Sequence, residues 1–178
     1  MKIMSVIGTR PEAVKMAPVV AALADSPGVQ EYVLVTAQHR QLLDQVLRLF
    51  NITPDHDLDV MSADQAPCDV FAQVLERIRP VLVDLQPDWM LVQGDTTTVL
   101  AATLAAAHHR VPVGHVEAGL RTYDRTNPFP EEINRVLTDH AASLHFAPTE
   151  NARRALLREG ISEETVRVTG NTVIDALQ

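Results

Sequence analysis

The chain is poor in cysteine and in aromatic residues, and both shortages exclude classes of protein. It has one cysteine, Cys68, in 178 residues, so no internal disulfide is possible, and this usage fits a reducing, cytoplasmic protein. We expect the Cys68 thiol to lie in the core. Aromatic residues make up only 4% of the chain, which argues against the stacking platforms that bind single-stranded nucleic acid.

Positive charge and long apolar runs are also scarce. Lys and Arg number 15 against 23 Asp and Glu, for a net charge of -8. A nucleic-acid partner is therefore not expected, because phosphate-backbone binding depends on many cationic side chains. The longest segment without Asp, Glu, Lys or Arg, Thr96 to His109, is too short to cross a bilayer, and the apolar start is too short for a signal peptide.

Several cofactor and catalytic motifs are missing. Only Gly8 of a GxGxxG fingerprint is present, and there is no Walker lysine loop, which argues against NAD or ATP as ligand. The chain contains no HExxH motif and no Cys/His ligand spacing, so we expect no metal. A GxSxG nucleophile elbow is absent as well.

Short apolar, β-branched runs alternate with segments of helical period. Such alternation predicts a mostly parallel sheet with helices on both faces, in one Rossmann-like, doubly wound α/β domain. Residues 42–50 and 70–85 have helical spacing, with a kink or break expected at Pro80, and the last residues read as the start of another helix. Predicted strands cover residues 3–7, 32–35, 89–92, 113–116, 144–146 and 166–168, with a weaker one at 58–61.

Polar residues follow these strands, at the edge where doubly wound sheets bind ligands. Gly8 permits a tight strand exit and Pro11 suits a first helical position, so Arg10 lies beside a helix N-terminus that attracts anions. With Lys15 one turn later, this predicts a phosphate or pyrophosphate site. The alternative is a capped helix with Glu12 and Lys15 as a surface pair. The side chains that caps and turns do not explain, and that we expect to face the same rim, are Arg10, Gln38, His39, Glu117 and Arg121.

The segment QGDTTT places Asp95 at a strand end before three threonines. Threonines open a helix poorly unless their hydroxyls cap or bind something. We expect Asp95 to be a carboxylate that orients a hydroxyl or transfers a proton. The alternative is that it is only an N-cap.

Residues 114–135 carry a further set of charged groups. Glu117 ends a strand, and Glu131 and Arg135 lie four apart on one helix face, where Arg135 can hold the Glu131 carboxylate. The alternative for Glu131 and Glu132 is simple compensation of the helix dipole. With Asp95, Glu117 and Glu131 beside Arg10 and Lys15, the cleft is suited to proton transfer next to a phosphorylated carbon.

The segments GTRPEAVKMAPVV, TAQHRQLLDQVL, QGDTTTVLAATLAA, GHVEAGLRT, PFPEEINRVLTDHAASLHFAPTE and VTGNTVIDAL resemble the non-hydrolysing UDP-N-acetylglucosamine 2-epimerases of bacteria. This resemblance implies two Rossmann-like domains of the glycosyltransferase B type. Residues 1–178 would be the N-terminal domain, and the C-terminal nucleotide-binding domain is absent from the chain. Members of the family are commonly homodimers.

The resemblance also implies interconversion of UDP-GlcNAc and UDP-ManNAc for polysaccharide synthesis, by elimination and re-addition of UDP without a cofactor. We expect the 178-residue chain alone to be inactive. The implied roles are diphosphate binding by Arg10 and Lys15, substrate binding by His115, catalysis by Asp95, Glu117 and Glu131 with support from Arg135, and a regulatory UDP-GlcNAc site at Gln38 and His39.

Two other functions fit the same residues. One is a stand-alone sugar-nucleotide-binding or regulatory module without catalysis, and the other is half of a transferase of the glycosyltransferase B type. The set of Asp95, Glu117 and Glu131 favours the enzyme, because like charges beside an anion cost a pure binder affinity.

Overall fold

A parallel sheet of seven strands forms the centre of the computed structural model, which describes residues 1–36, 40–60 and 65–177. The strand order is β3-β2-β1-β4-β5-β6-β7, so the order reverses between β1 and β4. A reversal of this kind is the ligand-binding position of doubly wound folds. The strands are β1 Lys2–Ile7, β2 Gln30–Val35, β3 His56–Asp57, β4 Trp89–Gln93, β5 Val113–Val116, β6 Leu144–Ala147 and β7 Val166–Val168.

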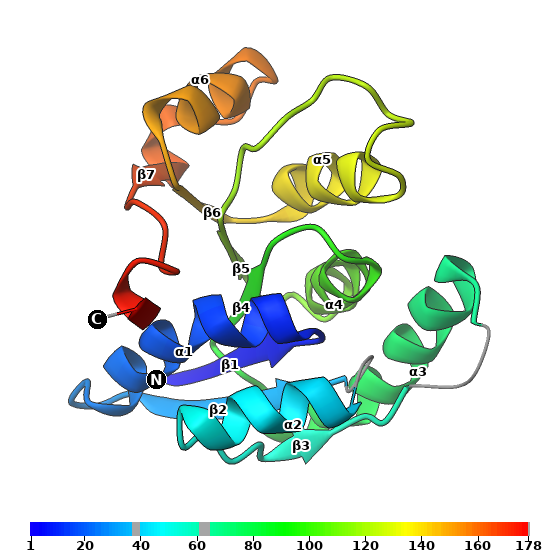
Figure 1. The fold of residues 1–178 in the computed structure, drawn as a ribbon, viewed down its shortest axis with the longest axis vertical. Helices are drawn as coiled ribbons and strands as arrows, with labels where there is room; N and C mark the ends of the chain where they lie inside the picture. The colour runs from blue at the N-terminus through cyan, green and yellow to red at the C-terminus, as the bar shows by residue number, and fades with distance from the viewer. Residues whose placement is uncertain (37–39, 61–64, 178) are drawn as a thin grey trace.

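Helices cover both faces of the sheet (Figure 1). Alternate residues of β1 serve the two faces: Ile3 and Ile7 pack with α1 and α2, whereas Met4 and Val6 pack with α3 and α4. Both faces are therefore apolar, as the uninterrupted apolar strands predict, and the Rossmann-like fold is confirmed. The helices are α1 Arg10–Ala24, α2 Arg40–Leu49, α3 Pro67–Leu85, α4 Thr97–His108, α5 Glu131–Ala141 and α6 Glu150–Arg158, with 3-10 turns η1 Glu163–Thr165 and η2 Asp175–Leu177.

The weaker strand predicted at residues 58–61 is wrong for residues 58–60, which form no strand, and Met61 lies outside the described residues. The edge strand is β3, which ends at Asp57. Asp59 has a φ of 46°, and this left-handed conformation ends the extended run. Leu58 and Val60 are nevertheless buried against α3, which explains the apolar pattern.

Helix α3 also differs from its prediction. It continues through Pro80 to Leu85, so of the predicted kink or break the break is wrong, and a kink stays a prediction. Pro80 and Glu76 are both exposed, and water can satisfy the Glu76 carbonyl that loses its donor. Cys68 is exposed and is not a core thiol, because the buried stripe of α3 begins at Val70, about 200° further around the helix.

The chain after β7 forms the short 3-10 helix η2 where an α-helix was expected. It packs against α1. Within the described residues, no helix is both long enough and apolar enough to cross a membrane.

Candidate functional site

The turns after β1 and β4 meet where the strand order reverses. A Cβ atom on Gly8 would lie 2.9 Å from the Thr98 side chain and 3.0 Å from the Thr36 hydroxyl. Only glycine therefore permits this approach without displacement of its neighbours. Thr98 is buried and shares a 3.3 Å hydrogen bond with Thr36, so this hydroxyl has an internal partner.

Glu12 joins these two turns. Its carboxylate accepts hydrogen bonds from the Gly8 N–H at 2.5 Å, the Thr9 N–H at 3.2 Å and the Thr96 hydroxyl at 2.8 Å. Burial raises the pKa of Glu12 to about 6, and these hydrogen bonds oppose the shift. Glu12 is buried, so the alternative of a surface pair with Lys15 is wrong. The Thr9-x-x-Glu12 spacing is that of a capping box, and this signal could have identified it.

Lys15 instead pairs with Glu117 across the strand reversal. Lys15 Nζ lies 2.6 Å from Glu117 Oε2, and their side chains are 24% and 11% exposed. Glu117 also accepts from Gln93 Nε2 at 2.6 Å and from Asn171 Nδ2 at 2.9 Å. Gln93 and Asn171 are not among the predicted site residues, although each is polar and lies at or after a strand end.

The backbone of Glu117 is itself unusual. Its φ is 68°, a left-handed conformation that costs a non-glycine residue about 1–3 kcal/mol. Three donors on the carboxylate hold the side chain above this turn. Backbone strain of this kind is concentrated at functional sites, which makes Glu117 a candidate functional residue.

Asp95 lies on the neighbouring turn. Its carboxylate is 32% exposed and lies 3.2 Å from Arg135 Nη1, while Asn134 Nδ2 donates to the Asp95 carbonyl at 3.0 Å. The N-cap of α4 is Thr96, whose hydroxyl accepts from the Val99 N–H. Asp95 is therefore not an N-cap, and its side chain is directed to the edge of the sheet.

Most of the predicted site residues contribute to the electrostatic environment of Asp95. Burial raises its pKa, and the carboxylates of Glu131 and Glu117 raise it further, whereas Arg135 and Lys15 lower it. Asp95 therefore interacts electrostatically with the other two predicted carboxylates and with Lys15. Such a cluster can hold and release a proton above the ordinary carboxyl range.

Glu131 begins α5 and has no ion pair among the described residues. The predicted Glu131–Arg135 pair is wrong, because Arg135 donates through Nε to Glu132 at 2.7 Å and through Nη1 to Asp95. Glu131 instead borders a pocket of about 280 Å³ at the carboxyl edge. The pocket is lined by Thr9, Gln65, Pro67, Val70, Thr96, Thr97, Pro130 and Glu131.

Glu132 is a structural carboxylate. It is buried and accepts from the Thr122 N–H at 3.1 Å and the Tyr123 N–H at 2.8 Å, as well as from Arg135. Burial favours a higher pKa, but the donors from Thr122, Arg135 and Tyr123 lower it. Glu132 therefore holds the β5–α5 loop and positions Arg135, which goes beyond compensation of the helix dipole.

Arg10 is exposed at the first residue of α1, where it adds positive charge beside the helix N-terminus. It makes no ion pair within the described part of the chain. Gln38 and His39, predicted for a regulatory site, lie outside the described residues.

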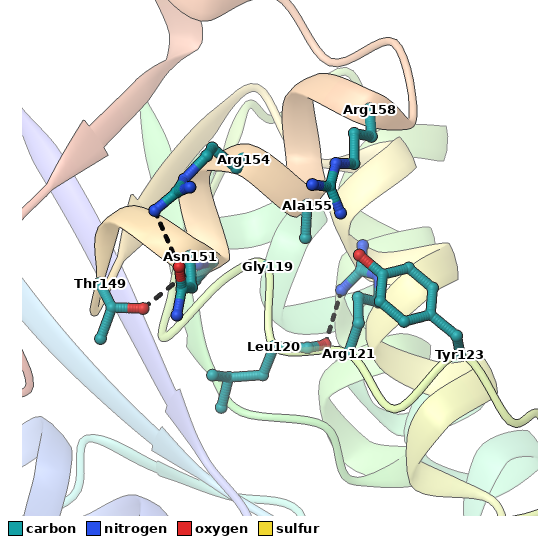
Figure 2. A pocket seen from close by; sticks show the side chains of 10 residues that line it. Gly119, Leu120, Arg121, Tyr123, Thr149, Asn151, Arg154, Ala155 and Arg158 are labelled. Carbon is teal, nitrogen blue, oxygen red and sulfur yellow. Dashed lines mark hydrogen bonds between the residues drawn. The ribbon is translucent and has the colours of Figure 1, made fainter.

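A second pocket of about 280 Å³ lies between the Glu117–Arg121 turn and α6 (Figure 2). Gly119 has a φ of 84°, and a Cβ atom there would lie 2.3 Å from the Ala152 carbonyl oxygen, so the turn packs directly on α6. Arg154 and Arg158 line the outer wall, and Arg154 Nη2 donates to Asn151 Oδ1 at 2.9 Å.

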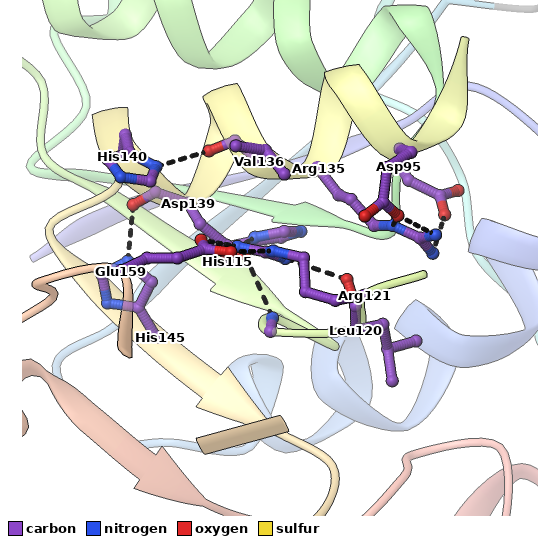
Figure 3. A network of polar contacts seen from close by, with 12 residues as sticks. Asp95, His115, Leu120, Arg121, Arg135, Val136, Asp139, His140, His145 and Glu159 are labelled. Carbon is purple, nitrogen blue, oxygen red and sulfur yellow. Dashed lines mark hydrogen bonds and ion pairs between the residues drawn. The ribbon is translucent and has the colours of Figure 1, made fainter. Parts of the chain in front are cut away.

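His115 and Arg121 lie beneath the rim (Figure 3). The His115 side chain is 0% exposed, and both ring nitrogens contact protein oxygens. The Arg121 side chain is 1% exposed and binds Asp139 and Glu159, so the expectation that it faces the rim is wrong. Asp139, which the sequence analysis missed, accepts from both residues. Among the described residues, no group of three or more His, Cys, Asp or Glu side chains is arranged to hold a metal ion.

Comparison with known proteins gives a consistent result. A family model described as UDP-N-acetylglucosamine 2-epimerase matches residues 21–178. A Yersinia pestis protein named UDP-N-acetylglucosamine 2-epimerase is 59% identical over 177 residues, which are 99% of this chain and 47% of the relative. The chain therefore spans about half the length of the curated relatives it matches.

Solved structures agree. The UDP-GlcNAc 2-epimerase of Neisseria meningitidis, crystallised with UDP-GlcNAc, matches with a TM-score of 0.96 and 51% identity over 99% of this chain and 48% of the other. A lipopolysaccharide outer core galactosyltransferase matches with a TM-score of 0.69 and 15% identity over 96% of this chain and 46% of the other. At that identity, the second likeness concerns the fold alone.

Proposed function

Since the chain belongs to the UDP-N-acetylglucosamine 2-epimerase family, we propose that residues 1–178 form the N-terminal half of an enzyme that interconverts UDP-GlcNAc and UDP-ManNAc. In this proposal a C-terminal nucleotide-binding domain completes the protein and holds the uridine. The Neisseria relative was crystallised with UDP-GlcNAc, which supports a UDP-sugar as the ligand of the cleft.

The observation that carries the proposal is the gathering of these side chains at the carboxyl edge: Lys15 Nζ lies 2.6 Å from Glu117 Oε2, Arg135 Nη1 lies 3.2 Å from Asp95 Oδ2, and Glu131 lines the pocket beside Thr96. Epimerisation at C2 requires a base to take the C2 proton while the C1–O bond breaks and its electron pair leaves with UDP. The sugar then holds a C1–C2 double bond. UDP returns to C1, and a proton is delivered to the opposite face of C2. Carboxylates serve the proton transfers, and cations stabilise the departing diphosphate.

The residues divide these tasks by their surroundings. Asp95, whose pKa is raised chiefly by burial, is suited to carry a proton and is oriented by Arg135. Glu117 is held in place by hydrogen bonds from Lys15, Gln93 and Asn171. Glu131 faces the pocket at the carboxyl edge. Arg10 and Lys15 supply the positive charge for the diphosphate.

Three parts of the proposal rest on the family resemblance: a homodimeric assembly, a cytoplasmic location, and a regulatory UDP-GlcNAc site at Gln38 and His39. Polysaccharide synthesis is the expected use of the product. His115 is assigned to positioning instead of substrate contact, since its ring is buried with both nitrogens bonded.

Incubation of the full-length protein with UDP-GlcNAc in D2O tests the reaction. Proton NMR should show UDP-ManNAc and deuterium at C2 of both sugars, because the C2 proton exchanges with solvent. The 178-residue chain alone is the control and should give neither. Binding of UDP-GlcNAc by the full-length protein without any C2 deuterium would instead establish a binding module.

A further inference from the structure

Two buried histidines lie side by side in the sheet and differ in their partners. His115 of β5 pairs in register with His145 of β6, and they are 0% and 1% exposed. His145 Nε2 lies 2.7 Å from the Asp139 carbonyl oxygen. Its Nδ1 has only longer contacts, 3.3 Å to the Thr165 carbonyl oxygen and 3.4 Å to the Thr165 hydroxyl, which itself donates to the Ser162 carbonyl. One N–H on Nε2 therefore makes the single short contact of this ring.

His115 faces acceptors on both sides. Nδ1 lies 2.6 Å from Asp139 Oδ1, and Nε2 lies 2.7 Å from the Gly94 carbonyl oxygen. A carboxylate and a carbonyl cannot donate, and a neutral imidazole has only one N–H. Two N–H groups, and hence a positive charge, are needed to make both contacts.

The surrounding charges support the same conclusion. Arg121 Nη2 lies 2.8 Å from Asp139 Oδ2 and 2.7 Å from Glu159 Oε2, and the Arg121 and Asp139 side chains are at most 1% exposed. With His115 protonated, the four groups, which come from β5, the following loop, α5 and the C-cap of α6, sum to zero charge. A neutral His115 would leave one uncompensated negative charge in this largely buried cluster, which is costly.

The cluster is joined to both candidate catalytic turns. The Gly94 carbonyl that binds His115 belongs to a turn residue with a φ of 83°, immediately before Asp95. Asp139 Oδ2 accepts from the Gly119 N–H at 3.1 Å, two residues after Glu117. The His115 ring and the Asp139 carboxylate therefore hold the backbone of both turns, one beside Asp95 and the other beside Glu117.

We propose that His115, held as an imidazolium between Asp139 and the Gly94 carbonyl, is a positioning residue that sets the placement of Asp95 and Glu117. This role rests on the proposed epimerase function. Burial opposes the charge on His115, but Asp139 outweighs it and raises the histidine pKa. Both acceptors are satisfied only while the ring keeps its second N–H, so the proposal gives His115 no part in proton transfer during turnover.

The test compares His115→Gln with His145→Gln in the full-length protein. A glutamine at position 115 can donate to only one of the two acceptors, whereas one at 145 can still donate to the Asp139 carbonyl. We expect His115→Gln to lower kcat about 10- to 100-fold with KM within about threefold, since no substrate contact is lost. His145→Gln should lower the melting temperature and leave kcat within about twofold.

A folded His115→Gln variant with wild-type kcat would overturn the proposal, as would an equal loss of kcat in His145→Gln. Neutron diffraction from D2O-exchanged wild-type crystals at a pD of about 8 gives an answer that does not depend on variant folding or activity. Deuterium on both His115 ring nitrogens supports the imidazolium brace, and deuterium on only one refutes it. Lack of activity in the wild type would count against the proposed function, while the neutron result would still decide the state of His115.

Discussion

Lys15 Nζ donates to Glu117 Oε2 at 2.6 Å, so a cation predicted for the diphosphate and a carboxylate predicted for catalysis share one ion pair. The two residues are 102 positions apart and meet because only β4 separates β1, which precedes the Lys15 helix, from β5, which ends just before Glu117. Under the proposed function, a bound diphosphate would compete with Glu117 for Lys15. Occupation of that site would then be coupled to the electrostatic environment of the carboxylate.

Replacement of Lys15 by Met should lower kcat/KM about 100-fold or more, because one charge serves both the diphosphate and Glu117. The measurement is steady-state epimerisation by the full-length protein. Lys2→Met is the matched control, since Lys2 binds the Leu85 carbonyl at the opposite end of β1. Equal losses in the two variants would contradict a specific role for Lys15.

Asn171→Asp should lower kcat about tenfold, because it places a second carboxylate against Glu117 Oε1 in place of an amide donor. Circular dichroism should show a folded protein. Asn151→Asp makes the same change on exposed α6, where Arg154 is the partner, and should retain full activity. The prediction fails if Asn171→Asp also retains full activity.

Glu31→Gln should stabilise the protein at neutral and alkaline pH. Its carboxylate oxygens are buried and accept no hydrogen bond of ordinary length in the described structure. Burial raises the pKa from 4.5 to about 7, with Ser5 opposing and Asp55 adding to the shift. Because the folded-state pKa is the higher one, the stability from protonated Glu31 is complete below pH 4.5 and is lost as pH rises through 7.

A glutamine at position 31 avoids this loss, so we expect the free energy of unfolding to rise by about 1 kcal/mol at pH 8, after discounting for solvent screening. Urea unfolding at pH 5 and pH 8 measures it. The gain should shrink at pH 5, and a gain equal at both pH values would exclude ionisation as the cause.

Glu12→Gln should have the opposite effect, although the pKa of Glu12 is also raised, to about 6. The carboxylate accepts from two backbone N–H groups and one hydroxyl, and an amide nitrogen in their midst would leave donors unpaired. A loss of about 1–3 kcal/mol in the free energy of unfolding is expected at pH 8. The same urea titrations compare the two variants directly. A change of the same sign in both free energies of unfolding would refute the distinction.

The sequence predicted the fold well because its strands are apolar throughout and their ends are marked by Gly and polar residues. It also placed Asp95, Glu117 and Glu131 at one edge, since the carboxyl ends of parallel strands coincide. Side-chain partners were less predictable. Arg135 could turn to the residue three or four positions before it, and only the loop at Thr122 shows why Glu132 is the buried partner.

The burial of particular polar side chains could not be predicted from the sequence either. His115 and Arg121 occupy positions that suit a rim as well as a core, and the difference depends on Asp139, which is contributed by another helix. Glu12 and Thr96, 84 residues apart, show the same dependence on distant partners. Local spacing identifies the chemistry of such residues but not the direction in which they point.

The link through Glu12 affects how this region opens. A carboxylate that holds the Gly8 and Thr9 amides and the Thr96 hydroxyl prevents either turn from opening without loss of contacts in the other. The amide hydrogens of both turns should therefore exchange with solvent at a common rate, as one cooperative unit. On this view the strand reversal opens as a single element and does not behave as two independent loops.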